Sequence, residues 1–349
     1  MPAHVMELPR MVVAGSGILA DTGRLLEDLE VGRKSLVLSG PHVKETVGNE
    51  LSSSLVNAGY TVEWSTVGAA SFYEAERAAS LAKKTDSKFI IGVGGGKSID
   101  VAKLAAYTCK IPFVSIPTSA SHDGISSPFA SVKGMDRPYS IVTKPPIAIF
   151  ADTSLIAKAP FQLLVSGCGD LVSKTTAVRD WELSNKRTGE YYGRYSASLA
   201  LLSATLIIED AVTIGSKSEE AVRVVVEALI SSGVAAGIAG SSRPCSGSEH
   251  LFGHALDIVA PGKGMHGEKC GIGTIMMARL HGIDYMKIKE ALLTIGAPTK
   301  ASDIGLSEKE IVEALVLART IRKERYTILD EVKLTESSAR DLASETGVT

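Results

Sequence analysis

The first 160 residues alternate short β-rich runs with helix-like stretches, and this alternation limits the possible folds more than any other feature of the sequence. Patterns of helical period lie between runs rich in Val, Ile, Phe and Thr, which occupy residues 34–40, 60–67, 88–94, 111–118 and 147–152. Strands that alternate with helices form parallel sheets covered by helices on both faces. We therefore predict an α/β domain with a parallel sheet and flanking helices over residues 1–160.

The pattern changes beyond Pro160. Long amphipathic stretches separated by Gly and Pro replace the β-branched runs, as in the segment "SEEAVRVVVEALISSG". This amphipathic pattern predicts an all-α domain over residues 161–349. A cleft between two such domains is the natural place for a ligand.

Composition and charge narrow the function classes. The chain has 349 residues, of which 45% are hydrophobic and 22% charged, and its formal net charge is −2. These values are typical of a globular protein, and the absence of a basic stripe makes nucleic acid an unexpected partner. No apolar run reaches the length of a membrane span, and the first residues lack the apolar core of a signal peptide. We expect a cytoplasmic protein with no membrane insertion.

The segment "FIIGVGGGKSID", residues 89–100, runs from a strand-like stretch through three glycines into a helix-like one. Glycines at such a junction let backbone amides approach an anion at the N-terminus of the helix. The spacing fits neither the P-loop nor the dinucleotide fingerprint, because Ile91 and Lys97 stand where those motifs need glycine. The segment predicts a phosphate-binding loop of another pattern, and a tight turn that binds nothing is the alternative.

Three of the seven histidines fall within seventeen residues. His250 and His254 are four apart, so on a helix they share one face, and His266 follows in a glycine-rich turn. This cluster favours a metal or catalytic site over structural histidines. Upstream, Asp170 follows the segment "SGCG", which we interpret as a flexible turn before a helix, where Asp170 could also serve as an N-cap.

Together these segments resemble a known superfamily over almost the whole chain. "GVGGGKSIDVAK" resembles the diphosphate loop of the glycerol dehydrogenases, iron-type alcohol dehydrogenases and dehydroquinate synthases. Four later segments are similar to archaeal-type sn-glycerol-1-phosphate dehydrogenases: "IPTSASHDGISSP", "GCGDLVSK", "RPCSGSEHLFGHALD" and "HGEKCGIGT".

The resemblance implies a dehydroquinate synthase-like fold and an NAD(P)-dependent enzyme. The expected reaction is the reversible reduction of dihydroxyacetone phosphate to sn-glycerol 1-phosphate, a step of archaeal phospholipid backbone synthesis. A glycerol dehydrogenase acting on unphosphorylated glycerol, or a dehydroquinate synthase-like lyase that uses NAD transiently, is the alternative. We expect a homo-oligomer, a dimer or larger, whose partner is a small-molecule substrate.

The resemblance also assigns residues. Those that match the NAD or NADP site are Gly94, Gly95, Gly96, Lys97, Ser98, Thr118, Ser119, Ala120, Ser121 and Ser127. Those that match the ligands of one zinc ion per subunit, acting as a Lewis acid on the substrate C2 oxygen, are Asp170, His250 and His266. Those that match substrate contacts are Asp123, Asp170 and His254, and Asp123 and His254 are the candidate catalytic proton carriers.

Lys174 stands where iron-type relatives have a histidine, four residues after the ligand aspartate. This difference favours a zinc site with three protein ligands. Lys174 facing the substrate phosphate is the alternative to a side chain that lies in solvent, and we expect the solvent position.

Overall fold

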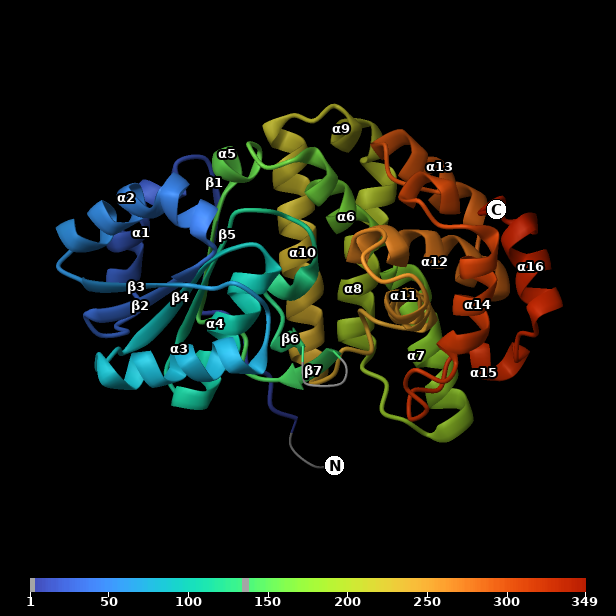
Figure 1. Ribbon diagram of the computed structural model, residues 1–349, viewed down its shortest axis with the longest axis horizontal. Coiled ribbons are helices and arrows are strands. Elements are labelled where there is room, and N and C mark those ends of the chain that lie inside the picture. The colour runs from blue at the N-terminus through green and yellow to red at the C-terminus, as the bar shows by residue number, and fades with distance from the viewer. Residues whose placement is uncertain (1–3, 134–137) are drawn as a thin grey trace. The chain divides into compact units, whose positions relative to one another are not determined.

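The computed structural model describes residues 4–133 and 138–349. The chain divides into two compact units, unit 1 (Met1–Pro160) and unit 2 (Phe161–Thr349) (Figure 1).

Unit 1 contains a six-stranded sheet in which every neighbouring pair is parallel, in the order β1-β8-β5-β4-β2-β3. Its strands are β1 (Met11–Gly15), β2 (Lys34–Ser39), β3 (Thr61–Thr66), β4 (Phe89–Gly94), β5 (Phe113–Pro117) and β8 (Ala148–Asp152). A separate antiparallel pair consists of β6 (Phe129–Lys133) and β7 (Pro138–Val142). The five predicted runs became β2, β3, β4, β5 and β8, whereas β1 and the antiparallel pair were not predicted.

Helices cover both faces of this sheet: α1 and α2 lie on one face, and α3 and α4 on the other (Figure 1). The helical elements of unit 1 are α1 (Ile18–Glu27), α2 (Pro41–Asn57), α3 (Phe72–Lys84), α4 (Gly96–Cys109), the 3-10 turn η1 (Asp123–Ile125) and α5 (Thr153–Ile156). The predicted α/β fold class is confirmed.

The adjacent strands β2 and β4 lead into helices on opposite faces, since α2 follows β2 and α4 follows β4. Ligands of open α/β sheets bind outside the carboxyl ends of strands at such a topological switch point. The residues that border this point are Ser39 and Gly40 after β2 and Gly94 to Gly96 after β4. The topology alone therefore marks the glycine loop as the ligand-binding edge of unit 1.

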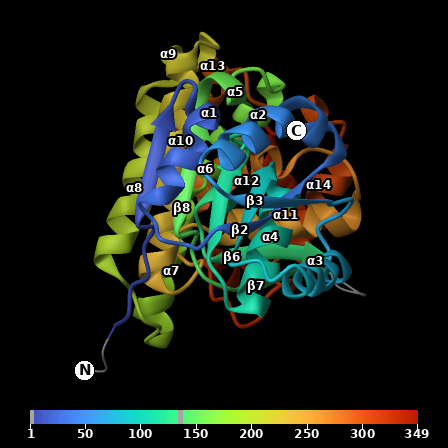
Figure 2. The same ribbon diagram turned by 90° about the vertical axis from the view of Figure 1, so that its left-hand side faces the viewer.

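Unit 2, all of whose residues the structure describes, contains no strand, so the predicted all-α architecture is confirmed. Its helices are α6 (Phe161–Val172), α7 (Lys174–Thr188), α8 (Arg194–Glu209), α9 (Ala211–Gly215), α10 (Glu219–Ala239), α11 (Ser248–Val259), α12 (His266–Leu280), α13 (Tyr285–Ile295), the 3-10 turn η2 (Ala301–Ile304), α14 (Glu308–Ala318), α15 (Ile328–Val332) and α16 (Glu336–Glu345). Helices α8 and α10 lie side by side (Figure 2).

Helix α10 is long and apolar enough to cross a membrane, judged by length and composition. However, 67% of its most apolar window is buried inside the protein, which is typical of a core helix. The Ser218 hydroxyl caps its N-terminus by accepting from the Ala221 amide, and Gly240 ends it in a left-handed conformation.

Candidate active site

Two helices of unit 2 touch backbone to backbone beside the residues predicted to bind metal. A Cβ added to Gly169 in α6 would lie 2.1 Å from the Gly267 carbonyl oxygen in α12. A Cβ added to Gly267 would lie 1.7 Å from the Ser166 carbonyl oxygen. Only glycine permits so close a contact between the two helices. Gly169 precedes Asp170 and Gly267 follows His266, so the contact brings these two predicted ligands near each other.

The bounds of α6 and α12 show that two sequence-based expectations were wrong. Asp170 does not follow a flexible turn at the start of a helix: it lies in the last turn of α6, and the glycines before it are helical. His266 is not inside a turn but is the first residue of α12. The glycines near both residues serve close helix packing as well as chain reversal, and the sequence pattern alone does not separate these roles.

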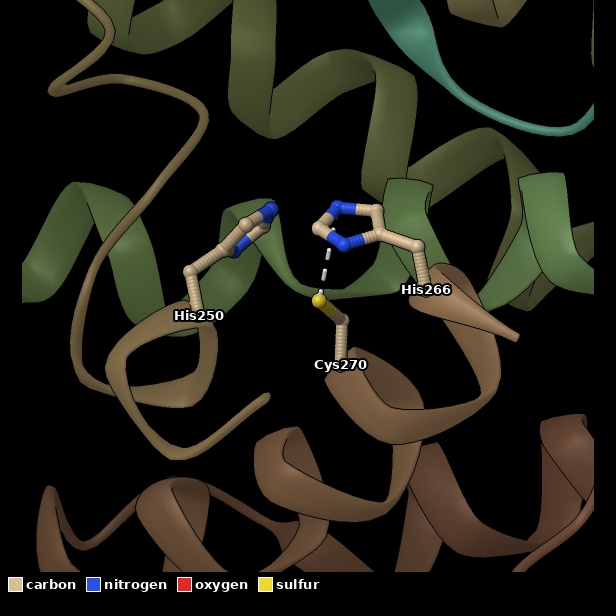
Figure 3. Close-up of side chains that lie close together, drawn as sticks. All are labelled: His250, His266 and Cys270. Atoms are coloured by element: carbon tan, nitrogen blue, oxygen red, sulfur yellow. Dashed lines mark hydrogen bonds between the residues drawn. The ribbon is translucent and has the colours of Figure 1, made fainter. Parts of the chain in front are cut away.

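Helices α11 and α12 bring His250, His266 and Cys270 together (Figure 3). Their ligand atoms all lie within 4.8 Å of one another, and the two histidine rings are 5.1 Å apart between centroids. The Nε2 atom of His250 lies 3.4 Å from Oδ1 of Asp170. Two imidazoles, a carboxylate and a thiol form a donor set that suits zinc.

Glu249 orients the His250 ring. Nδ1 of His250 lies 2.8 Å from Oε1 of Glu249, which leaves Nε2 on the side of Asp170. Glu249 is fully buried, and its carboxylate accepts hydrogen bonds from the Thr176 hydroxyl and the Gly247 amide, both 2.7 Å long. A carboxylate behind a histidine is the usual arrangement around a protein-bound metal.

Lys174 is fully buried, contrary to the expectation that it lies in solvent. Its ammonium donates to Oδ1 of Asp170 at 2.8 Å and to the Cys245 carbonyl oxygen at 3.2 Å. Lys174 and Asp170 are four apart in sequence, and the carboxylate compensates for the burial of the ammonium. Lys174 therefore holds the carboxylate in place.

The electrostatics of the cluster favour a cation. Burial acts to raise the pKa of Asp170, but Lys174, His250 and His266 lower that pKa well below its usual value. Burial acts to lower the pKa of His250, but Cys270, Asp170 and Glu249 raise that pKa well above its usual value. The carboxylates of Asp170 and Glu249 around the His250 ring thus stabilise positive charge at the place where a divalent metal would supply it.

His254 lies one helical turn beyond His250, with 31% of its side chain exposed. Its ring centroid is 6.2 Å from that of His266, and its Nδ1 is 3.7 Å from Oδ2 of Asp257. Burial, together with the charges of His250 and Arg322, lowers the pKa of His254 despite Asp257. The ring is therefore neutral at neutral pH and can accept a proton.

In unit 1 the structure brings the predicted cofactor residues from two strand ends together. Gly94 has a φ of 140°, and its carbonyl oxygen accepts a hydrogen bond from the Thr118 amide at 3.0 Å. A Cβ on Gly95 would lie 3.1 Å from the Ser119 hydroxyl. Lys97 is exposed, whereas Ser98, Ser119, Ala120 and Ser127 are buried, and Thr118 and Ser121 are partly buried.

Asp123 begins η1, and its carbonyl oxygen accepts from the Ser126 and Ser127 amides. Lys103 of α4 supports this segment: its buried ammonium donates to the Gly124 carbonyl at 2.8 Å, to the Phe129 carbonyl at 2.7 Å and to Asp100 at 3.4 Å. Lys103 therefore links the helix of the glycine loop to the segment that carries Asp123.

Sequence reasoning missed Cys270, Glu249 and the supporting role of Lys103. The spacing of Cys270 was readable, since it is four residues after His266 and on a helix shares its face. Glu249 gave a weaker signal, because adjacent residues of a helix normally point in different directions. Lys103 gave no signal, because a lysine in a helix is usually exposed.

Residues 13–160 match the family described as iron-containing alcohol dehydrogenase. A solved structure described as a probable glycerol dehydrogenase from Sinorhizobium meliloti 1021 is similar at a TM-score of 0.80 and 23% identity, over 99% of this chain and 98% of that chain. The fold is therefore that of the class containing iron-type alcohol dehydrogenases and glycerol dehydrogenases.

Relatives of higher identity define the family. Glycerol-1-phosphate dehydrogenase (NAD(P)+) of Nitrosopumilus maritimus (strain SCM1) is 50% identical, over 100% of this chain and 98% of the relative. The protein of the same name in Cenarchaeum symbiosum (strain A) is 51% identical over the same shares. The chain belongs to the glycerol-1-phosphate dehydrogenase family, which confirms the resemblance carried by the five segments.

Proposed function

We propose that this chain catalyses the NAD(P)-dependent interconversion of dihydroxyacetone phosphate and sn-glycerol 1-phosphate. The observation that carries the proposal is the full-length identity of about one half to relatives named for this activity. The buried cluster around His250 and the glycine loop at the switch point of the sheet provide the two sites that such an enzyme needs. The chain is an oxidoreductase that uses NAD(P).

A zinc ion fits the cluster in unit 2. Asp170, His250 and His266 would hold it, with Glu249 orienting His250 and Lys174 holding Asp170. When bound, zinc supplies Lewis-acid chemistry to the C2 oxygen of the substrate. Three protein ligands would leave a coordination position open, as a catalytic zinc site requires.

The chain's own residues would then handle the proton and the cofactor. His254 has a lowered pKa, so its neutral ring can accept the proton that the substrate hydroxyl loses, and Asp257 orients that ring. Asp123 would bond the substrate hydroxyl. The Gly94–Ser98 loop would bind the cofactor diphosphate at the N-terminus of α4, with Thr118 to Ser121 and Ser127 beside the nicotinamide half.

The wider setting is part of the same proposal. We infer a cytoplasmic homo-oligomer that supplies the glycerol phosphate backbone of archaeal membrane lipids. Its product is a small, charged, water-soluble molecule, and helix α10, the candidate for a membrane span within the described residues, is mostly buried.

Substrate kinetics test the reaction. NADH oxidation should be fast with dihydroxyacetone phosphate and at least about 100-fold less efficient with dihydroxyacetone. The product should be the sn-1 enantiomer, which a stereospecific enzymatic assay identifies. A preference for the unphosphorylated substrate would overturn the proposal in favour of a glycerol dehydrogenase.

Matched histidine variants test the metal assignment. His250→Ala should lose bound zinc, whereas His254→Ala should keep it and lose turnover. Elemental analysis after dialysis measures the first effect, and kcat measures the second. Equal zinc loss in both variants would show that His254 is a ligand.

A further inference from the structure

The segment that follows α14 lies beside the loop that precedes α11, the helix that carries His250 and His254. Helix α14 packs against α11, and the chain then turns at residues 322–325, where the Arg325 amide donates to the Arg322 carbonyl at 3.0 Å (Figure 1). The Arg325 guanidinium donates to the Ser246 carbonyl at 2.5 Å and to the Ser242 hydroxyl at 2.8 Å. These bonds hold the turn against the segment that leads into α11.

This region concentrates positive charge. Arg243 is 2% exposed and donates to the Tyr326 carbonyl and to Glu190, yet its Nη1 has no hydrogen-bond partner in the part of the chain that the structure describes. Burial, with the charges of Arg322 and Arg243, lowers the pKa of Arg325 to about 10. Such crowding of like charges is typical of a site that binds an anion.

Among the partly or fully buried cations of this region, Arg322 is the one whose charged group is not bonded within the described residues, and its neighbour Lys323 is exposed. The Arg322 side chain is partly buried, and its guanidinium makes no hydrogen bond or ion pair with any residue in the ranges 4–133 and 138–349. Lys174 and Lys269 are bonded to Asp170 and Asp257. Arg243 and Arg325 are hydrogen-bonded to the surrounding chain. They therefore hold the turn in place, and their guanidinium groups do not present a free pair of parallel N–H donors to a ligand.

Arg322 also acts on the candidate catalytic histidine. Its charge is close enough to lower the pKa of His254, and the His254 ring is 6.2 Å from that of His266. A small substrate held between the metal cluster and His254 would therefore come within the field of Arg322.

We propose that Arg322 binds the phosphate group of the substrate and thereby makes the enzyme specific for a phosphorylated three-carbon substrate. This inference rests on the proposed function. A guanidinium presents two parallel N–H donors to a phosphate, which gives both affinity and orientation. Arg325 and Arg243 add positive charge behind it, and the phosphate relieves the repulsion among the three arginines.

The test compares two substrates in the zinc-loaded enzyme. Arg322→Ala should lower the ratio of kcat/KM for dihydroxyacetone phosphate to kcat/KM for dihydroxyacetone about 100-fold, because the change in the pKa of His254 affects both substrates alike and cancels in the ratio. Arg322→Lys should recover part of the loss, because an ammonium keeps the charge and loses the two-donor geometry. Arg319→Ala is the matched control: Arg319 is exposed and pairs with Asp330, and its loss should leave both substrates unaffected.

Inorganic phosphate provides a second readout that does not depend on turnover of the variant. It should compete with dihydroxyacetone phosphate in the wild type and bind at least about tenfold more weakly to Arg322→Ala, as measured by calorimetry. Suppose that the wild type prefers dihydroxyacetone phosphate and that Arg322→Ala keeps both this preference and its affinity for phosphate. That result would overturn the role of Arg322 and leave the proposed function standing. A wild type with no preference would overturn both.

Discussion

The glycine loop of unit 1 and the metal-type cluster of unit 2 are built in different ways. The loop is one continuous segment, Gly94–Ser98, at the end of a strand whose neighbour brings Thr118 beside it. The cluster takes Asp170 from α6, His250 from α11, and His266 and Cys270 from α12, so its geometry depends on how three helices pack. A site made of consecutive residues can be predicted from spacing, whereas a site made of packed helices requires knowledge of their contacts.

Glycines in the two regions pack against different kinds of atoms. In the loop, Gly96 lies against the end of a side chain, because an added Cβ would meet Nε2 of His122 at 2.1 Å. In the cluster, Gly267 lies against backbone, the Ser166 carbonyl. A side chain can rotate away and a packed helix backbone cannot, so the same substitution should have different consequences.

The largest effect is expected from Gly267→Ala. Because the added methyl group would overlap a backbone atom, α6 and α12 must separate, and we expect a loss of about 3 kcal/mol or more in the free energy of unfolding. Urea denaturation measures this loss, and zinc content should fall with it.

Gly253→Ala is the control for that experiment. A Cβ there would meet Cys270 and Lys269 at 3.6 and 3.7 Å, which are ordinary contacts, and helical alanine should stabilise α11 by about 0.5–1 kcal/mol. Equal stability of the two variants would mean that the close helix contact does not build the site.

The next effect concerns the ligand set. Asp170→Asn should lose most of its zinc, because a neutral amide is a weak ligand and leaves Lys174 buried without its carboxylate. Cys270→Ser should keep its zinc, because a catalytic site needs a position open to substrate and a fourth protein ligand would close it. Elemental analysis of both dialysed variants provides the comparison, and zinc loss from Cys270→Ser alone would make the thiol a ligand in place of the carboxylate.

How much the sequence could predict follows the same division. The strands around the loop were predicted closely, because alternation and apolar runs are local signals, while β1, an edge strand with a partly exposed face, was missed. In unit 2 the helical class was predicted, but Asp170 was misplaced and Lys174 was expected in solvent. Both errors have one cause: the burial of the Lys174–Asp170 pair and the glycine contact between α6 and α12 depend on tertiary packing, which no local pattern records.

A smaller effect is expected from Gly96→Ala in the loop. His122 can turn away at the cost of the hydrogen bond that its Nδ1 accepts from the Gly124 amide, so stability should change by only about 1 kcal/mol. The methyl group would, however, stand at the N-terminus of α4, and the KM for NADH should rise about tenfold. Gly68→Ala is the control, since its Cβ would meet only Glu74 at 3.9 Å. A Gly96→Ala enzyme with normal KM would remove the loop from the cofactor site.

The smallest effect concerns the choice between NADH and NADPH. In nucleotide-binding α/β domains, a carboxylate at the end of the second strand bonds the adenosine ribose and repels a 2′-phosphate. Here β2 ends at Ser39, whose hydroxyl is fully buried, and no carboxylate occurs before Glu45. We therefore expect both cofactors to be used, with kcat/KM values within about tenfold of each other.

Because Ser39 is buried, the charge that tests this must be introduced at exposed His42, in the first turn of α2. His42→Glu should lower kcat/KM for NADPH by about tenfold through like-charge repulsion and leave NADH nearly unchanged. His42→Gln separates the effect of charge from the loss of the imidazole. Steady-state kinetics with both cofactors measure this selectivity. A wild type that accepts NADH alone, or a glutamate variant with unchanged selectivity, would show that the end of β2 does not contact the adenosine ribose. In that case only the glycine loop, and not the end of β2, would belong to the cofactor site at the switch point.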